Sequence, residues 1–325
     1  MNRGMEPLTH TPGAHYEWNE SYYLCFSDRR SRLNGMTRLG FKPNRGEGST
    51  FLLLFLPDGS VAAFQGTEKM RSYPEALEAC GMIHARQPDG SWSYRFSGGA
   101  VIVRDPADFP RIRDDPALIT RLAPVVLNLH FDPVNETYEY SEHMTLESRE
   151  IGKKSGDEHW EQVAKISGEV RVGGDMYRLI DVVGQRDHTH GVRDWTGIGD
   201  WLYYVIWFNE RLAVNPAAIV LDDGRLSVGG FLWKEGRNIP IVGIRILDQQ
   251  FRNGVIPVSS VLELTDADDV KHVLKGKAGS VVPIPFIDEH GGVSILAQGF
   301  GEYELDDVKD GYGTYETLRM GSRRV

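Results

Sequence analysis

The stretch STFLLLFLPDGSVAAF (residues 49–64) places an apolar run on each side of PDG, residues 57–59. Pro, Asp and Gly favour the backbone angles of a tight turn, and apolar runs flanking such a turn are typical of a β-hairpin. The same arrangement occurs around PDG at 88–90 and DDG at 222–224. We therefore expect a chain built from short antiparallel strands.

Strand patterns recur at roughly 8–12-residue spacing, which favours a sandwich or a barrel over alternating β/α units. Helical patterns are short and few, at 73–81, 115–123 and 265–276; the last has a cap residue, early acids and a final Gly. The glycine-rich dinucleotide fingerprint, the Walker A sequence and the nucleophile elbow are all missing from the sequence. The predicted fold is all-β, with two tandem antiparallel barrels and a few short helices.

The polar segment REIGKKSGDEHWEQ (149–162) suggests where the two barrels are divided, because the strand pattern restarts after it. We expect an N-terminal barrel over 1–160 and a C-terminal barrel over 161–325 that carries the polar cluster at 184–195, each long enough for its own core. The net charge of −10 argues against binding to a nucleic-acid backbone. No signal peptide or apolar stretch of membrane-spanning length is present, and Cys25 and Cys80 have no metal-ligand spacing. A cytoplasmic protein without a membrane span is expected, with a homodimer as the default assembly.

The densest chemistry lies in GQRDHTHGVRDW (184–195). If this segment is a strand, Arg186, His188 and His190 share one face, and Asp187 and Thr189 share the other. Three interpretations follow. A histidine beside a carboxylate suits acid–base catalysis, with Asp187 or Asp194 tuning the ring and Arg193 holding a substrate oxygen. His188, His190 and Asp194 could instead bind a metal, or the cluster could be a structural polar network.

Aromatic residues follow directly in WTGIGDWLYYVIWF (195–208) and populate both faces of a predicted strand. One face can be core, and the other could line a pocket for a flat apolar ligand or lie between packed domains. Candidate ligand contacts are Trp195, Trp201 and Tyr203. Tyr22 and Tyr23, on opposite faces of the first predicted strand, are further candidates, although a core role is the ordinary one for a tyrosine.

Three segments together resemble an uncharacterised bacterial family of the lipocalin-like carotenoid 1,2-hydratase (CrtC/AttH-like) superfamily: NESYYLCFSD with GMTRLGFKPN, the central GQRDHTHGVRDW, and the closing GFGEYELDDVKDGYGTYE. The hydratases carry a similar Asp-His-x-Trp-Gly run, which maps onto Asp187–Gly191; this chain differs by having His190 in place of Trp. The resemblance implies two tandem lipocalin-like barrels with a ligand cavity. It also implies hydratase, cyclase or Diels–Alderase chemistry without a redox cofactor.

The sequence thus predicts a cofactor-independent lyase or isomerase acting on a hydrophobic terpenoid, polyketide-like or aromatic molecule. The expected catalytic residues are Asp187, His188, His190, Arg193 and Asp194, with no metal and no cofactor. A non-catalytic carrier of an apolar metabolite is the alternative, and a metal-dependent oxygenase or hydrolase using His188 and His190 is the second.

Overall fold

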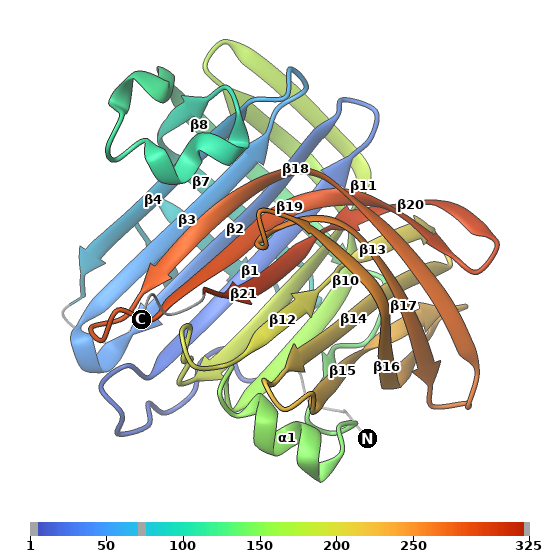
Figure 1. Cartoon of the computed structure of the whole chain (residues 1–325). Coiled ribbons are helices and arrows are strands. Elements are labelled where there is room, and N and C mark those ends of the chain that lie inside the picture. The colour runs from blue at the N-terminus through green and yellow to red at the C-terminus, as the bar shows by residue number, and fades with distance from the viewer. Residues whose placement is uncertain (1–5, 71–75, 322–325) are drawn as a thin grey trace. The chain divides into compact units, whose positions relative to one another are not determined.

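The computed structural model describes residues 6–70 and 76–321, most of which lie in antiparallel strands (Figure 1). The chain divides into two compact units. The first comprises residues 1–105, 114–139 and 156–193, and the second comprises 106–113, 140–155 and 194–325. The segment GQRDHTHG therefore lies in the first unit, where its strand pairs with the first strand of the chain.

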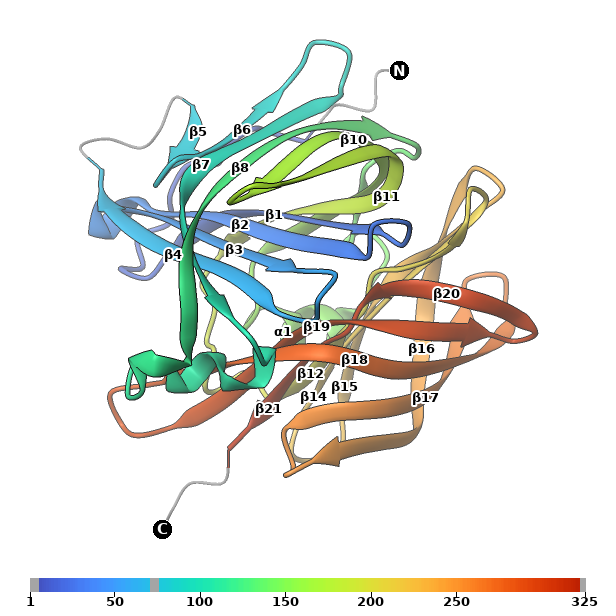
Figure 2. The ribbon, with the colours of Figure 1, turned by 90° about the horizontal axis from the view of Figure 1, so that it is seen from above.

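In the described part of the first unit there are eleven strands and two short 3₁₀ helices. These are β1 (Asn19–Asp28), β2 (Leu33–Lys42), η1 (Pro43–Arg45), β3 (Glu47–Phe55), β4 (Val61–Lys69), β5 (Leu77–Ala79), β6 (Met82–Arg86), β7 (Trp92–Val103), η3 (Pro116–Leu118), β8 (Ile119–Pro133), β9 (Tyr138–Glu139), β10 (Glu158–Val172) and β11 (Asp175–Gly191). Their sheet runs in the order β4-β3-β2-β1-β11-β10-β8-β7, and β4 pairs with β7 to close it into a ring. Figure 2 shows β1–β4 on one side of this ring and β7, β8, β10 and β11 on the other.

The interior of the first ring is filled by inward-facing side chains from these strands. Leu24 and Phe26 of β1, Leu39 and Phe41 of β2, and Phe96 of β7 belong to one buried cluster. A closed sheet has no free edge, and its alternate residues form the core, which explains the period-2 pattern of the sequence. The ring is therefore a packed barrel.

The second unit repeats this architecture. Its elements are η2 (Pro106–Arg111), α1 (Leu146–Gly152), β12 (Asp200–Tyr203), β13 (Ile206–Asn209), β14 (Leu212–Val220), β15 (Leu226–Lys234), β16 (Arg237–Arg252), β17 (Ile256–Asp266), β18 (Lys271–Ile287), β19 (Val293–Leu305), β20 (Val308–Thr314) and β21 (Glu316–Met320). The order β12-β21-β19-β18-β17-β16-β15-β14 closes through a β12–β14 pairing. The prediction of an all-β chain with two antiparallel barrels and a few short helices is confirmed.

The three predicted hairpins are also confirmed. Phe55 pairs with Val61, Arg86 with Trp92 and Val220 with Leu226 across the turns at 57–59, 88–90 and 222–224. The glycine closing each turn has a positive φ of 83–87°, a conformation that favours glycine.

The helix predicted over 265–276 is wrong. Asp266 accepts hydrogen bonds from the backbone N–H groups of Asp268 and Val270, so DADD forms the turn between β17 and β18. His272 and Leu274 then alternate with more exposed residues along β18. The acids that resembled a helix start are turn residues, because Asp caps both structures. At 115–123, Pro116–Leu118 is a 3₁₀ turn and β8 begins at Ile119; at 73–81, Leu77–Ala79 is strand β5 and residues 73–75 lie outside the described part.

Over the described residues, no helix is long and apolar enough to cross a membrane.

Candidate functional site

Strand β11 carries the central stretch and separates its side chains onto two faces. Glu20, Tyr22 and Leu24 of β1 lie opposite His190, His188 and Arg186 respectively. Tyr22 and Leu24 belong to the core cluster, so these three β11 residues point into the first barrel. Asp187 and Thr189 point out of it. The predicted alternation is therefore confirmed up to Gly191, whose φ of 114° ends the strand.

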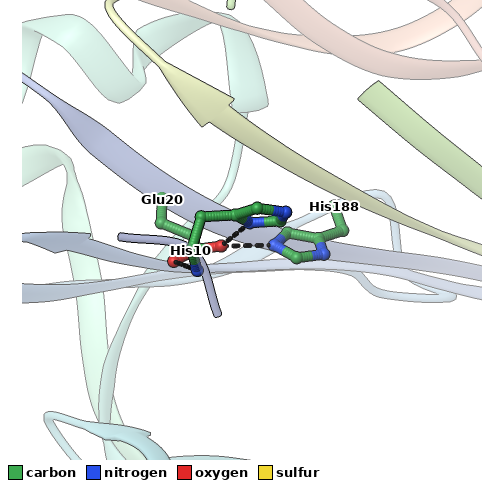
Figure 3. A group of neighbouring side chains, drawn as sticks. All are labelled: His10, Glu20 and His188. Carbon is green, nitrogen blue, oxygen red and sulfur yellow. Dashed lines mark hydrogen bonds and ion pairs between the residues drawn. The ribbon is translucent and has the colours of Figure 1, made fainter. Parts of the chain in front are cut away.

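His188 is the centre of a buried polar group inside the barrel. Its side chain is fully buried, and its Nε2 lies 2.8 Å from Oε1 of Glu20, which is also fully buried. The same Glu20 oxygen lies 2.7 Å from Nδ1 of His10, so one carboxylate oxygen contacts both rings (Figure 3). Tyr22 stacks on the His188 ring with centroids 4.3 Å apart. Trp160 of β10 lies across the strand, 5.2 Å from the same ring.

Glu6 and Arg186 form a second ion pair next to His188 on the inner face of the barrel. Arg186 donates to both carboxylate oxygens of Glu6, at 2.6 and 2.9 Å, and its Nε donates to Gln162. The side chains of Glu6 and Arg186 are 2% and 4% exposed, so this is a buried ion pair. The His188 Nδ1 lies 3.5 Å from the nearer oxygen of Glu6. His188 is thus placed between two carboxylates.

The environment sets the protonation of these groups. Burial alone would lower the pKa of His188, but hydrogen bonds and charge from Glu20 and Glu6 outweigh it and raise that pKa. Burial would raise the pKa of Glu20, but the hydrogen bonds of His10 and His188 lower it. Burial likewise opposes ionisation of Glu6, while the charge of Arg186 and the hydrogen bonds of His188 and Arg186 lower its pKa to about 2. The surroundings therefore favour the charged form of His188 and the ionised forms of Glu20 and Glu6.

His190 is the more exposed of the two inward-facing histidines of β11. Its ring stacks on His10 at 3.9 Å, and its Nε2 lies 3.4 Å from Glu158. Burial and the nearby charge of His10 lower the pKa of His190 below its ordinary value, despite Glu158. The pKa of His188 is therefore raised and that of His190 is lowered, although both side chains lie on the same face of β11.

The outer face of β11 carries a second cluster. His159 Nε2 lies 2.7 Å from Glu161, and its Nδ1 lies 2.5 Å from Thr189 Oγ1. Gln185 donates to the other oxygen of Glu161. Burial raises the pKa of Asp187 to about 6, and Glu161 adds to this, while His159, Arg193 and Arg38 oppose it. Burial lowers the pKa of His159 to about 4, so that ring is neutral at pH 7.

The predicted catalytic residues are thus divided. His188 and His190 are inside the barrel with Tyr22, whereas Asp187, Arg193 and Tyr23 belong to the outer face. The carboxylates that contact His188 are Glu20 and Glu6, since neighbouring strand residues point in opposite directions. Asp194 lies after the strand and accepts a hydrogen bond from the Gly197 backbone N–H at 2.9 Å, which closes a turn.

The predicted aromatic wall lies in the second unit. Trp195 stacks on Phe286 at 4.3 Å, and Trp201 donates from Nε1 to Glu316 at 3.0 Å. Both tryptophans pack against the small cluster of Ile198, Leu296 and Leu318, and Tyr203 is half-buried beside them on β12. Leu202 of β12 and Tyr204, the residue after this strand, belong to the core of the second barrel. The predicted single strand over 195–208 is two short strands, β12 and β13, and the role of these aromatic residues in ligand binding stays a prediction.

Three groups of donors among the described residues have metal-ligand spacing, each with its ligand atoms within 4.8 Å of one another. They are His10 with Glu20 and His188, His10 with Glu158 and His190, and His159 with Glu161 and Asp187. Histidine nitrogen with carboxylate oxygen suits zinc or iron. The predicted set of His188, His190 and Asp194 is not among them, because Asp194 caps the turn described above.

Sequence reasoning missed Glu6, His10 and Glu20. Their contacts with β11 span 168 to 180 residues of chain, a distance that no local pattern reveals. Glu20 stands at an inward position of a strand that was predicted correctly, and an inward carboxylate opposite a histidine-bearing strand was the available signal. HWE at 159–161 offered a similar signal for the outer cluster.

No curated protein matches the sequence at a significant level. Among solved structures, the chain is similar to a Nitrosomonas europaea protein provisionally assigned as AttH, with 12% identity, a TM-score of 0.62 and 94% of each chain covered. It is also similar to CghA, with 9% identity, a TM-score of 0.54, and 93% of this chain and 87% of that chain covered. At these identities the likeness concerns the fold, which is of the AttH type with two lipocalin-like barrels. The model of a domain of unknown function (DUF7064) matches residues 6–320, and the chain therefore belongs to the DUF7064 family.

Proposed function

We propose that the protein is a cofactor-independent enzyme of lyase or isomerase type that moves a proton to or from a hydrophobic small molecule. The single observation behind this is the buried pair of His188 and Glu20 inside an apolar barrel. A histidine whose one nitrogen is held by a carboxylate has a fixed orientation and a stabilised charge. The other nitrogen is then directed at the reacting group.

In this mechanism Glu20 orients the ring through Nε2, and the proton is exchanged at Nδ1. Nδ1 lies 3.5 Å from Glu6, a contact longer than the 2.8 Å between Nε2 and Glu20. The charged ring would donate its Nδ1 proton to an alkene carbon or to a leaving hydroxyl group, and would take a proton back in the second half of the reaction. Tyr22 and Trp160 border the ring and exclude water from it.

The protein surroundings support this assignment. The inner face of β11 is continuous with a large apolar core, which suits a hydrophobic substrate and strengthens electrostatic effects by keeping the local dielectric low. The structural neighbours, an AttH-type protein and CghA, support a lipocalin-like enzyme in general terms. A carrier would gain little from burying two carboxylates and two basic groups in its interior.

The test is a reaction run in D₂O. Purified protein is incubated with a panel of hydrophobic alkenes and tertiary alcohols. Mass spectrometry follows deuterium incorporation, which reports hydration, isomerisation or cyclisation that begins with protonation of an alkene, and loss of water, which reports dehydration. We expect incorporation with at least one class, and a fall of roughly 10²–10⁴-fold in Glu20→Gln, which keeps the shape of the side chain but not its charge. Binding of panel members without any exchange would indicate a carrier and would refute the proposal.

A metal-dependent reaction is the second candidate, and the donor set of His10, Glu20 and His188 favours it (Figure 3). It predicts about one Zn²⁺ or Fe²⁺ per chain after purification and dialysis, lost in His10→Ala. Elemental analysis of the two proteins decides between the candidates, since acid–base catalysis by His188 and Glu20 requires no metal.

A further inference from the structure

The carboxylate of Glu6 occupies the inside of the first barrel in the manner of a bound ligand. Both of its oxygens accept hydrogen bonds from Arg186, and its backbone oxygen accepts one from Arg86 at 2.7 Å. The Arg186 guanidinium in turn lies over the Trp92 ring, 4.7 Å from its centroid. Bidentate pairing with a planar guanidinium on an aromatic surface is a strong and specific way to hold a carboxylate.

The segment that delivers Glu6 is not part of the barrel wall. Residues 6–18 form no helix or strand. The segment is held by Arg186, by the hydroxyl of Tyr22, which donates to the Leu8 carbonyl, and by Glu20, which accepts from the backbone and ring of His10. Leu8 packs against the apolar core. Glu6 and Leu8 together therefore present a carboxylate attached to an apolar body.

Unpaired polar atoms lie around the same place. Both ring nitrogens of His84 and Nε1 of Trp92 are buried without a hydrogen-bond partner. The His84 ring lies 4.5 Å from Tyr94 and 6.4 Å from Tyr22. Buried polar groups are rarely left unpaired, and those that are often serve a ligand. With Glu6 in place, the ring nitrogens of His84 and Nε1 of Trp92 therefore remain without a hydrogen bond.

We propose that Arg186, Arg86 and Trp92 form a binding site for an apolar carboxylic acid, in which Glu6 is an intramolecular occupant that the acid displaces. This inference rests on the proposed function, because it names the substrate class of the same barrel interior. A buried ion pair gains little net stability, since desolvation offsets most of its attraction. An incoming carboxylate that makes the same contacts can therefore replace Glu6 at small cost, and the departing segment uncovers His188.

The experiment measures binding rather than turnover, so that it can fail independently of the catalytic proposal. Octanoate, 1-naphthylacetate and cis-parinarate are each titrated against the full chain by calorimetry, alongside their methyl esters. Glu6→Gln removes the competing charge, and we expect it to bind at least one acid about tenfold more tightly than the parent chain does. The ester of that acid is expected to bind at least about tenfold more weakly than the acid.

The matched control is the double variant Glu6→Gln/Arg186→Gln, in which no charge of the pair is left buried alone. Circular dichroism and thermal unfolding check that it folds. We expect it to lose the preference for acid over ester while still binding the apolar body. Equal binding of acid and ester by Glu6→Gln, no binding of any of the three acids, or unchanged acid binding in the double variant would each overturn the proposal. His188→Asn separates the two ideas: acid binding is expected to persist there, whatever happens to deuterium incorporation.

Discussion

The two faces of strand β11 carry similar residues in opposite electrostatic states. On the inner face, Glu20 and Glu6 favour the charged form of His188 by raising its pKa, and Arg186 is paired with Glu6. On the outer face, His159 is neutral, and Asp187 resists ionisation beside Glu161. Burial favours the neutral forms on both faces, but on the inner face the charged partners of His188 outweigh it, whereas on the outer face burial prevails at His159 and Asp187. His159 contacts the carboxylate of Glu161, whereas His188 lies between the carboxylates of Glu20 and Glu6.

This comparison supports the proposal that the inner face is the chemical site. A protonated His188 held by the Glu20 carboxylate can donate a proton and take one back. In the neutral His159 ring, both nitrogens are already engaged by Thr189 and Glu161. The outer cluster is therefore interpreted as a structural polar network.

Removal of the central carboxylate of each face should show the largest contrast. Glu20→Ala leaves His188 and His10 without their shared acceptor, and it is expected to cost roughly 3–5 kcal/mol in the free energy of unfolding. Glu161→Ala removes hydrogen bonds to a neutral ring and relieves repulsion with Asp187, so a loss of about 1–2 kcal/mol is expected. Urea unfolding measures both. Equal losses would show that the two faces are not electrostatically different.

His188 and His159 should have pKa values on opposite sides of the ordinary histidine value. His188 is expected to keep both ring protons at pH 7, because its pKa is raised, and His159 to have lost one, because its pKa is lowered to about 4. The raised pKa means that the stabilisation from His188 is complete below the unfolded value and is lost as pH rises through the folded one. Imidazole ¹⁵N chemical shifts report both rings. A neutral His188 at pH 7 would contradict the assignment.

Asp187→Asn should stabilise the protein at neutral pH. The folded pKa of about 6 lies above the ordinary 3.8, so the folded state binds this proton more tightly and stability falls as pH rises between those values. Asn cannot ionise, and the variant should unfold several degrees higher than the parent at pH 7 but at nearly the same temperature at pH 4. Thermal unfolding at both pH values checks this, and a destabilised variant at pH 7 would mean that the Asp187 charge is paired after all.

Thr189→Val should have the smallest effect. It keeps the shape of the side chain and removes the hydroxyl that contacts His159 Nδ1, at a cost of about 1 kcal/mol. Proton transfer should be unchanged, because the hydroxyl lies on the outer face. If this variant lost most of its deuterium incorporation, the outer face would have to be part of the reaction.

The sequence was sufficient for the class of fold and for the alternation along β11. Turn triplets and period-2 patterns are local, and they located the hairpins at 57–59, 88–90 and 222–224. The failure at 265–276 has a local cause too, since an Asp-rich turn and a helix cap use the same side-chain hydrogen bonds.

The partners of His188 could not be predicted in this way. Glu20 meets it through the pairing of β1 with β11, and Glu6 arrives on a segment that has no regular structure. Both contacts depend on closure of the ring, which joins segments far apart in the chain. Asp187 and Asp194 were the nearest carboxylates in sequence, but strand geometry directs Asp187 outward and leaves Asp194 beyond the strand.

The most direct test of the inner-face assignment compares His188→Gln with His159→Gln in the D₂O assay. Gln can still donate to the neighbouring carboxylate in both variants, so the fold should persist, which circular dichroism checks. We predict that His188→Gln lowers deuterium incorporation by roughly 10²–10⁴-fold, and that His159→Gln changes it by less than about threefold. Full incorporation in His188→Gln, or an equal loss in both variants, would contradict the account.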